Sequence, residues 1–143
     1  MTSQLLEQVI VPIATEEDAQ KTCDALKVHV DADAQLHIVH VIEKGGGSPD
    51  KAPIGARQRQ ADEIFERVEK SLESAGYELE TELRYGTSVI DEIVAAATES
   101  DGTAIAFVPR EGGRITRLLT GDKTRDLVAI DQVPVIALPN EST

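Results

Sequence analysis

The sequence predicts an α/β domain in which an open parallel sheet of five strands lies between layers of helices. Short runs of β-branched and small apolar residues alternate about five times with segments whose apolar residues recur at helical spacing. The intervening segments are long enough for crossovers between parallel strands, which are right-handed in nearly all known cases. At 143 residues the chain fits one domain around a single core. We expect this domain to cover residues 1–139 and residues 140–143 to form a disordered tail.

The first strand and helix follow from residues 8–30. The run QVIVPIA (8–14) is β-branched, and Thr15 with the acidic Glu16 and Glu17 is typical of a helix start, where acids favour the positive end of the helix dipole. The helix that follows has one apolar face, made of Ala19, Cys23, Leu26 and Val30. Cys23 is therefore interpreted as a core residue rather than a reactive thiol.

The second strand is the apolar run QLHIVHVIE (35–43), whose pattern is typical of a strand covered on both faces. Three glycines at 45–47 follow, but no Gly-Lys-Ser/Thr comes after them, so we interpret this segment as a linker. A second helix is expected over 56–75. It is followed by Gly76, which can adopt the left-handed conformation that stops a helix. Its apolar stripe consists of Ala61, Ile64, Val68, Leu72 and Ala75.

The last three strands are predicted at 78–85, 103–109 and 133–139. A third helix lies between the first two of these, with a cap at Thr87 or Ser88 and an end at Gly102. The fourth strand, TAIAFVP, is small and apolar throughout, as a central strand between helix layers is. Pro134 and Pro139 bracket the last strand, where the missing N–H groups are tolerated.

Composition excludes several classes of function. The chain has 26 acidic and 14 basic residues and a formal charge of -12, so its overall field repels nucleic acid and anionic membranes. No apolar run reaches the ~18 residues of a membrane span, and the N-terminus lacks the features of a secretory signal. We therefore expect a cytoplasmic protein without membrane insertion. The acidic surplus and the six lysines favour a salt-adapted source.

No catalytic or metal site is predicted. The chain has one cysteine, and no Gly-x-Ser-x-Gly elbow or zinc spacing is present. His37 and His40 are three residues apart on one strand, so their side chains lie on opposite faces and cannot share a metal. These histidines, and His29, are interpreted as structural. We do not expect an enzyme, although weak ATP hydrolysis is kept as an alternative.

Four fragments in the same order and spacing resemble the universal stress protein (UspA-like) family. They are VIVPIATEEDAQKTCDAL, LHIVHVIE, YGTSVIDEIVAAATESDGTAIAFVP and REGGRITRLLTGDKTRDLVAIDQVPVIALP, which together cover nearly the whole chain. The resemblance implies a three-layer, Rossmann-like sandwich of the adenine-nucleotide alpha-hydrolase-like type. It also implies a stress-response or regulatory function, which the fold alone would not define.

The resemblance places a phosphate site after the fourth strand, but the family's signature there is degenerate. Nucleotide-binding members carry Gly, two residues, Gly, nine residues and Gly-Ser, because glycines let the backbone approach phosphate. Aligned on Gly121, this chain has Val108 and Glu111 in place of the first two glycines and Asp122 in place of the serine. A valine side chain blocks close approach, and two carboxylates repel an anion. The phosphate end is therefore predicted to be unsuited to a triphosphate.

The resemblance also places the base and ribose end of the site after the first strand. Relatives have an aspartate shortly after the strand's proline, whereas here Pro12 is followed by Ile13, Ala14 and Thr15. Val41 matches a position that contacts adenine through its backbone. Almost any residue can make such a contact, so this match says little about binding. We therefore expect no cofactor, with ATP, AMP or a phosphate-like anion as the alternative. The residues of the altered site are Pro12, Ile13, Ala14, Val41, Val108, Arg110, Glu111, Gly113, Gly121, Asp122 and Lys123.

A cluster of basic residues surrounds the degenerate signature and has two interpretations. It consists of Arg110, Arg114, Arg117, Lys123 and Arg125. The side chains could clamp a sulfate, a phosphate or an acidic partner. Alternatively, they lie on a solvated helix face and pair with neighbouring carboxylates. Nucleic acid is disfavoured, because the chain has no tryptophan, two tyrosines and two phenylalanines to stack on bases.

The function predicted from the sequence is that of a homodimeric adaptor without ATP binding, whose protein partner is unknown. The last strand is apolar and would be an exposed edge if left alone, which proteins normally cover or pair. Members of the family commonly pair this strand across a two-fold axis, and isologous pairing satisfies both copies. The residues expected in this contact are Val133, Val135, Ile136, Ala137 and Leu138. A nucleotide or anion sensor with a remodelled pocket is the alternative function.

Overall fold

The computed structural model describes residues 4–43, 54–109 and 131–139. It contains a short 3-10 turn, η1 (Gln4–Leu6), followed by β1 (Gln8–Pro12), α1 (Glu16–His29), β2 (Gln35–Glu43), α2 (Ile54–Glu73), β3 (Glu78–Gly86), α3 (Val89–Glu99), β4 (Ala104–Phe107) and β5 (Val135–Ala137). The predicted linker glycines 45–47, the basic cluster and the tail 140–143 lie outside the described residues.

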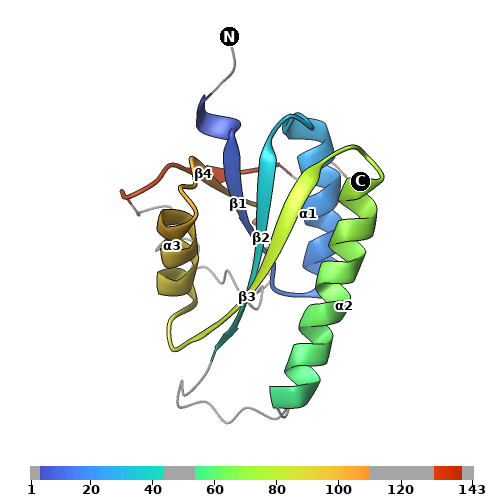
Figure 1. The fold of residues 1–143 in the computed structure, drawn as a ribbon, viewed down its shortest axis with the longest axis vertical. Coiled ribbons are helices and arrows are strands. Elements are labelled where there is room, and N and C mark those ends of the chain that lie inside the picture. Colours follow the sequence, from blue (N-terminus) through green and yellow to red (C-terminus); the bar gives the residue numbers. More distant parts are fainter. Residues whose placement is uncertain (1–3, 44–53, 110–130, 140–143) are drawn as a thin grey trace.

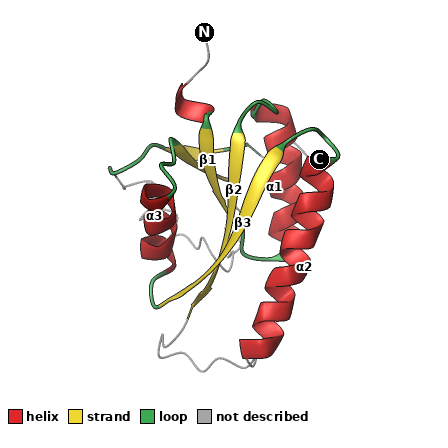
Figure 2. Cartoon of the chain, viewed as in Figure 1, coloured by secondary structure: helices red, strands yellow, loops and turns green. Residues whose placement is uncertain are grey.

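The five strands form one parallel sheet in the order β3-β2-β1-β4-β5. Helices α1 and α2 cover one face of this sheet and α3 covers the other, as Figures 1 and 2 show. The predicted fold class, an open parallel sheet between helix layers, is therefore confirmed. The strand order reverses direction between β1 and β4, which places that pair at the centre of the sheet.

Two apolar clusters form the core, one on each face of the sheet. Alternation along the strands divides them: Val9 and Val11 belong to the cluster under α1 and α2, whereas Ile10 belongs to the cluster under α3. Cys23 is 1% exposed in the first cluster, and burial raises the pKa of its thiol. The interpretation of Cys23 as a core residue is confirmed.

The helix ends agree with the sequence in three places and differ in one. Thr15 caps α1 and Ser88, rather than Thr87, caps α3, while Gly76 ends the α2 region with φ 93. The left-handed residue after α3 is Asp101, at φ 56, and not Gly102. Gly102 is required for another reason, since a Cβ there would lie 2.7 Å from Cγ1 of Ile10. The prediction that Gly102 itself ends the helix is thus corrected.

Three predicted strands are shorter than expected. Isolated hydrogen bonds nevertheless continue the pairing beyond the observed ends of two of them. Predicted 8–14 is observed as Gln8–Pro12, 103–109 as Ala104–Phe107 and 133–139 as Val135–Ala137. Beyond the strand ends, the Ile13 N–H donates to the Val39 carbonyl at 2.9 Å and the Leu138 N–H donates to the Phe107 carbonyl at 2.7 Å.

The start of β4 is fastened to the chain before β1 by one hydroxyl group. The Oγ1 of Thr103 accepts bonds from the N–H groups of Glu7 at 3.3 Å and Gln8 at 3.0 Å, and it donates to the Leu5 carbonyl at 2.8 Å. These partners are 95 or more residues away in the sequence. Thr103 therefore fixes the position of η1 relative to the centre of the sheet.

Candidate functional site

The carboxyl ends of β1 and β4 form the candidate functional site. In open α/β sheets, ligands bind where the strand order reverses, outside the carboxyl ends of the strands. Here β1 and β4 are neighbours, with Val9 opposite Ala104 and Ile10 opposite Ile105. The fold therefore brings Pro12, at the end of β1, to the same edge as the chain leaving β4.

The predicted site residues at this edge divide between the two faces of the sheet. Ala14 packs against the cluster under α3, to which Val41 also belongs. Ile13 and Val108 lie on the opposite face, in or against the cluster under α1 and α2. The structure thus brings Ala14 and Val41 to one face and directs Ile13 and Val108 to the other.

Both backbone polar groups of Ile13 have partners within the protein. Its N–H donates to the Val39 carbonyl at 2.9 Å, and its carbonyl accepts from Nδ1 of His40 at 2.7 Å. Because a carbonyl only accepts, Nδ1 of His40 carries a proton. The Ile13 side chain is 1% exposed, so this residue is part of the scaffold.

His40 is a buried support for the turn after β1. Burial lowers the pKa of its imidazole, the bond to Ile13 acts in the opposite direction, and the charge of Arg57 lowers the pKa further. Its ring meets the ring of Phe65 edge-on, with centroids 6.4 Å apart. His40 is therefore neutral at pH 7 and structural, as the sequence indicated.

Ala14 and Thr15, which follow Ile13, offer no carboxylate at this edge. Ala14 has only a methyl group, and the Thr15 hydroxyl accepts a hydrogen bond from the Asp18 N–H at 3.0 Å to cap α1. This capping follows from the sequence, because threonine before a helix with acidic first-turn residues is a typical start. The chain leaving β1 therefore presents apolar side chains and a threonine hydroxyl that already caps α1.

Side chains from the first turn of α2 hold the carboxyl ends of two further strands. Arg57 donates from Nη2 to the Glu43 carbonyl at 2.8 Å, and Gln58 donates to the hydroxyl of Tyr85. No pattern in the sequence predicts these contacts, because they join a helix to strand ends through single side chains. They fix the rim of the site on the β2 and β3 side.

The phosphate end of the predicted site is described only in part. Val108 is half-buried against the core. The other residues predicted there, namely Arg110, Glu111, Gly113, Gly121, Asp122 and Lys123, lie outside the described residues, as do the remaining basic residues of the cluster. For these positions the sequence argument stays a prediction.

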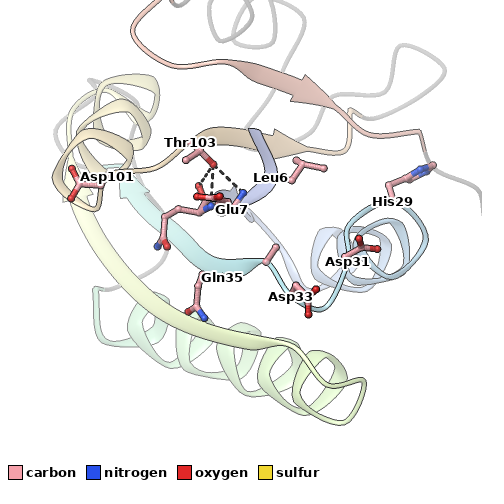
Figure 3. A pocket seen from close by; sticks show the side chains of 10 residues that line it. Leu6, Glu7, His29, Asp31, Asp33, Gln35, Asp101 and Thr103 are labelled. Atoms are coloured by element: carbon pink, nitrogen blue, oxygen red, sulfur yellow. Dashed lines mark hydrogen bonds between the residues drawn. The ribbon is translucent and has the colours of Figure 1, made fainter. Parts of the chain in front are cut away.

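A hollow of about 950 Å³ lies at the opposite end of the sheet, where the strands begin (Figure 3). Its wall includes four carboxylates, from Glu7, Asp31, Asp33 and Asp101, together with His29. A site so acidic repels the anionic ligands that bind at the edges of such sheets. Within the described ranges, no three histidine, cysteine or carboxylate side chains are placed to hold a metal ion.

A charged network lies on the α3 side of β3. His37 Nε2 is 2.7 Å from Oε1 of Glu82, and Glu82 also pairs with Arg84 at 2.6 Å. Arg84 reaches Glu92 at 2.9 Å and Glu99 at 3.1 Å on α3. This arrangement confirms that His37 and His40 face opposite sides of the sheet. It links β3 to β2 and α3.

The charges in this network shift one another's protonation. Burial acts to raise the pKa of Glu82, but bonds from His37 and Arg84 outweigh it and lower that pKa. The bond to Glu99, together with those to Glu92 and Glu82, raises the pKa of Arg84 despite its partial burial. These directions of shift keep Glu82 and Arg84 ionised near neutral pH.

The residues predicted for dimer contact lie at the other edge of the sheet. Val133, Val135 and Ile136 are half-buried, and Ala137 is exposed. Leu138 is 5% exposed and packs in the cluster under α1 and α2, so it supports the strand from within. The strand β5 is therefore an apolar edge that pairs with β4 on its inner side.

Comparisons with known proteins agree with this geometry. Residues 6–139 match the model of the universal stress protein family. A universal stress protein from Archaeoglobus fulgidus is 21% identical, with a TM-score of 0.64 and coverage of 92% of this chain and 93% of that one. A second structure of a universal stress protein from this organism, solved in complex with dAMP, is 20% identical, with a TM-score of 0.63 and coverage of 94% of this chain and 98% of that one.

A bacterial structure shows the same fold. The universal stress protein UspA from Lactobacillus plantarum is 16% identical, with a TM-score of 0.68 and coverage of 93% of this chain and 97% of that one. No curated protein matches the sequence significantly. In the part of the chain that the structure describes, no helix is long and apolar enough to cross a membrane.

Proposed function

Because this chain belongs to the universal stress protein family, we propose that it is a regulatory domain that works as a homodimeric adaptor and does not bind ATP. The observation that carries this proposal is that Ile13, Ala14 and Thr15, which follow β1, offer no carboxylate and use their polar groups within the fold. The polar groups of Ile13 and the Thr15 hydroxyl are used by the fold, and Ala14 has none in its side chain. None of these three residues has a carboxylate that could accept a hydrogen bond from a ligand's ribose, and the Thr15 hydroxyl already accepts the capping bond from Asp18.

The sequence after β4 supports the same conclusion. Glu111 and Asp122 put two carboxylates where the family's signature has a glycine and a serine. Two charges of the same sign at ~4 Å repel by about 1 kcal/mol in water and by more where water is excluded. A triphosphate at this position therefore meets repulsion as well as the bulk of Val108.

The homodimer is supported by the edge strand β5. Residues 133–139 contain no charged side chain, although 28% of the whole chain is charged. An uncharged apolar edge is a template for pairing, and a two-fold axis lets both copies use it at once. Since the chain carries a formal charge of -12, an uncharged strip is where two copies repel each other least.

A second candidate is a sensor that keeps a nucleotide or another anion in a remodelled pocket, with weak ATP hydrolysis as a further alternative. It is favoured by the similar Archaeoglobus fulgidus structure, which was solved with dAMP. The backbone contact with adenine that the family makes at the position of Val41 does not depend on the side chain there. Arg110 and Lys123 of the basic cluster would supply positive charge for an anion.

Titration with ATP, AMP and inorganic phosphate distinguishes the two candidates. The chain has no tryptophan and two tyrosines, so a co-purified adenine would dominate its ultraviolet absorbance. We expect no such absorbance and no thermal shift, whereas a ligand at 100 times its Kd would add about 2.7 kcal/mol of stability. A clear shift with ATP would overturn the adaptor without ATP binding.

A restored variant tests the reason for the loss. Ala14→Asp combined with Val108→Gly, Glu111→Gly and Asp122→Ser returns the family's residues to both ends of the site. We expect this variant to gain a measurable ATP affinity in calorimetry. The matched control is Ala32→Asp, an exposed alanine after α1, which adds the same carboxylate at the other end of the sheet and gains nothing.

A further inference from the structure

His40 occupies a buried position near the carboxyl end of β2, where three parts of the chain meet. It is 7% exposed and lies on the face of the sheet that α1 and α2 cover. Its Nδ1 donates to the carbonyl of Ile13, 27 residues away in the sequence, at 2.7 Å, and its ring meets the ring of Phe65 edge-on. His40 therefore joins β2 both to the turn after β1 and to α2.

The charged group that acts on this buried ring is a cation. On β3 the register partner of His40 is the apolar Leu83, and the turn after β1 presents Ile13. The first turn of α1, which follows that turn, carries three acidic residues, namely Glu16, Glu17 and Asp18. The electrostatic part of the pKa shift of His40 nevertheless comes from the guanidinium of Arg57 on α2, which lowers the pKa in addition to the larger effect of burial.

Protonation of His40 changes its contact with α2 more than its contact with β1. Nδ1 already carries the hydrogen that is donated to the Ile13 carbonyl, so an added proton binds Nε2 and leaves that hydrogen bond in place. The imidazolium is then a buried charge beside a second cation, Arg57. Burial and repulsion both favour a movement that brings water to the ring and separates the two cations. Because the bond to Ile13 favours the charged ring, the repulsion acts on the side of α2.

The first turns of α2 are the part of this contact that can move. Residues 55–60 are each half-buried or exposed, whereas the apolar stripe further along the helix is buried. Arg57 holds the first turn through its bond to the Glu43 carbonyl at 2.8 Å, and Gln58 holds it through its bond to the hydroxyl of Tyr85. Segments with few buried side chains open locally at a low cost in free energy. A positive charge beside Arg57 can therefore release these turns before the sheet unfolds.

We propose that His40 is an acid-sensitive latch, which keeps the first turns of α2 on the carboxyl ends of β2 and β3 at neutral pH and releases them when its ring takes up a proton. The released edge adjoins the candidate functional site, so acid changes which polar groups this edge presents. Because the folded-state pKa is lowered, the closed form is fully favoured above the ordinary histidine pKa of about 6.5 and progressively less below it. The latch goes beyond the proposed adaptor function and does not depend on it.

Titration of the imidazole rings in the unsubstituted chain is the first test. The chain has three histidines, and nuclear magnetic resonance follows the ring of each one as the pH is changed. The signal of His40 is the one that is missing from the variant His40→Asn. We expect its midpoint to lie below the ordinary histidine pKa. A midpoint at or above the ordinary value would overturn the latch, because the folded protein would then take up the proton without any opposition.

Amide hydrogen exchange locates the release. Between about pH 7 and pH 5, where histidines titrate, and after correction for the intrinsic exchange rate, we expect protection to fall at residues 58–61 and to persist in β1. His40→Asn keeps an N–H donor near the position of Nδ1 but takes up no proton, so protection of its α2 is expected to stay constant with pH. A loss with falling pH that is equal in this variant, or that extends through the whole sheet, would overturn the latch.

The matched control is the other buried histidine of β2. His37 lies on the opposite face, where its Nε2 is 2.7 Å from Glu82, and His37→Gln keeps a donor near that position. This variant should retain the pH dependence of exchange in the first turns of α2. If it abolished that dependence, the response would belong to His37 and the assignment to His40 would be wrong. Where His40→Asn is less stable overall, the change of protection with pH is compared rather than its level.

Discussion

The two edges of the sheet differ in length and in charge. At one edge, β3 extends over nine residues, and its α3 side carries Glu80, Glu82 and Arg84. At the other, β5 has three residues and no charge. Charged side chains along an edge strand oppose the addition of another strand. We call β3 the closed edge and β5 the available edge, because charge disfavours the addition of a strand at β3 and is absent from β5.

The largest expected effect is at the available edge. Ala137→Pro removes an outward N–H from β5 without removing a bond to β4. In a paired dimer, two bonds are lost and two carbonyls are left unsatisfied, which costs about 3 kcal/mol, or about a hundredfold in the dimer's Kd. Sedimentation equilibrium measures this change. An unchanged Kd would show that the dimer forms elsewhere.

The next effect concerns the closed edge. Arg84→Met removes the cation between Glu82, Glu92 and Glu99, whose carboxylates then face one another across β3 and α3. We expect a loss of about 2 kcal/mol in the free energy of unfolding, measured with urea, because hydrogen bonds to charged groups contribute about 1.5–3 kcal/mol. The double variant Arg84→Met/Glu92→Gln should recover part of the loss. Dimerisation through β5 should be unaffected.

A smaller, pH-dependent effect separates the edges further. The pKa of Glu82 is lowered in the folded state, so its contribution to stability is present above the ordinary carboxyl pKa and is lost as the pH falls through the folded value. Glu82→Gln should therefore destabilise the protein at pH 7 and have progressively less effect towards pH 3. Urea midpoints at several pH values check this. Glu80→Gln, at a side chain that is 82% exposed, is the control and should show little effect at any pH.

The smallest effect on stability is expected from Glu80→Val. Exposed substitutions usually change the free energy of unfolding by less than about 0.5 kcal/mol. The informative measurement is association, because valine makes β3 more apolar and weakens the protection of that edge. We expect light scattering to detect species larger than the dimer at high concentration. Their absence would mean that Glu78, Glu82 and Arg84 suffice to protect the strand.

The sequence was enough to predict the fold, because the strands and helices carry clear periodic patterns. The covered strand at 35–43 and the stripe from Ala61 to Leu72 were both placed correctly, whereas Ala75, predicted as the last residue of that stripe, lies beyond α2 and is exposed. Strand ends were placed less well, since isolated bonds such as that of Leu138 continue the ladder beyond them. The end of α3 was assigned to Gly102, because nothing local shows that Asp101 adopts the left-handed conformation.

The candidate site was less predictable. That Ala14 offers no polar side chain follows from its identity alone. That the Ile13 carbonyl is held by His40, 27 residues away, depends on how β2 lies beside β1. The same is true of Arg84, whose partners Glu92 and Glu99 on α3 could not be selected from 26 acidic residues. Such pairs join different elements and leave no periodic signal.

The bonds made by Thr103 have a consequence for synthesis on the ribosome. The central strand β1 is near the start of the chain, but its neighbour β4 is translated about a hundred residues later, at ~5–20 residues per second. Until Thr103 has left the exit tunnel, β4 cannot pair with β1, and β1 can pair only with β2. Nascent chains therefore spend seconds with one edge of β1 unpaired, and a chaperone would bind them in that interval.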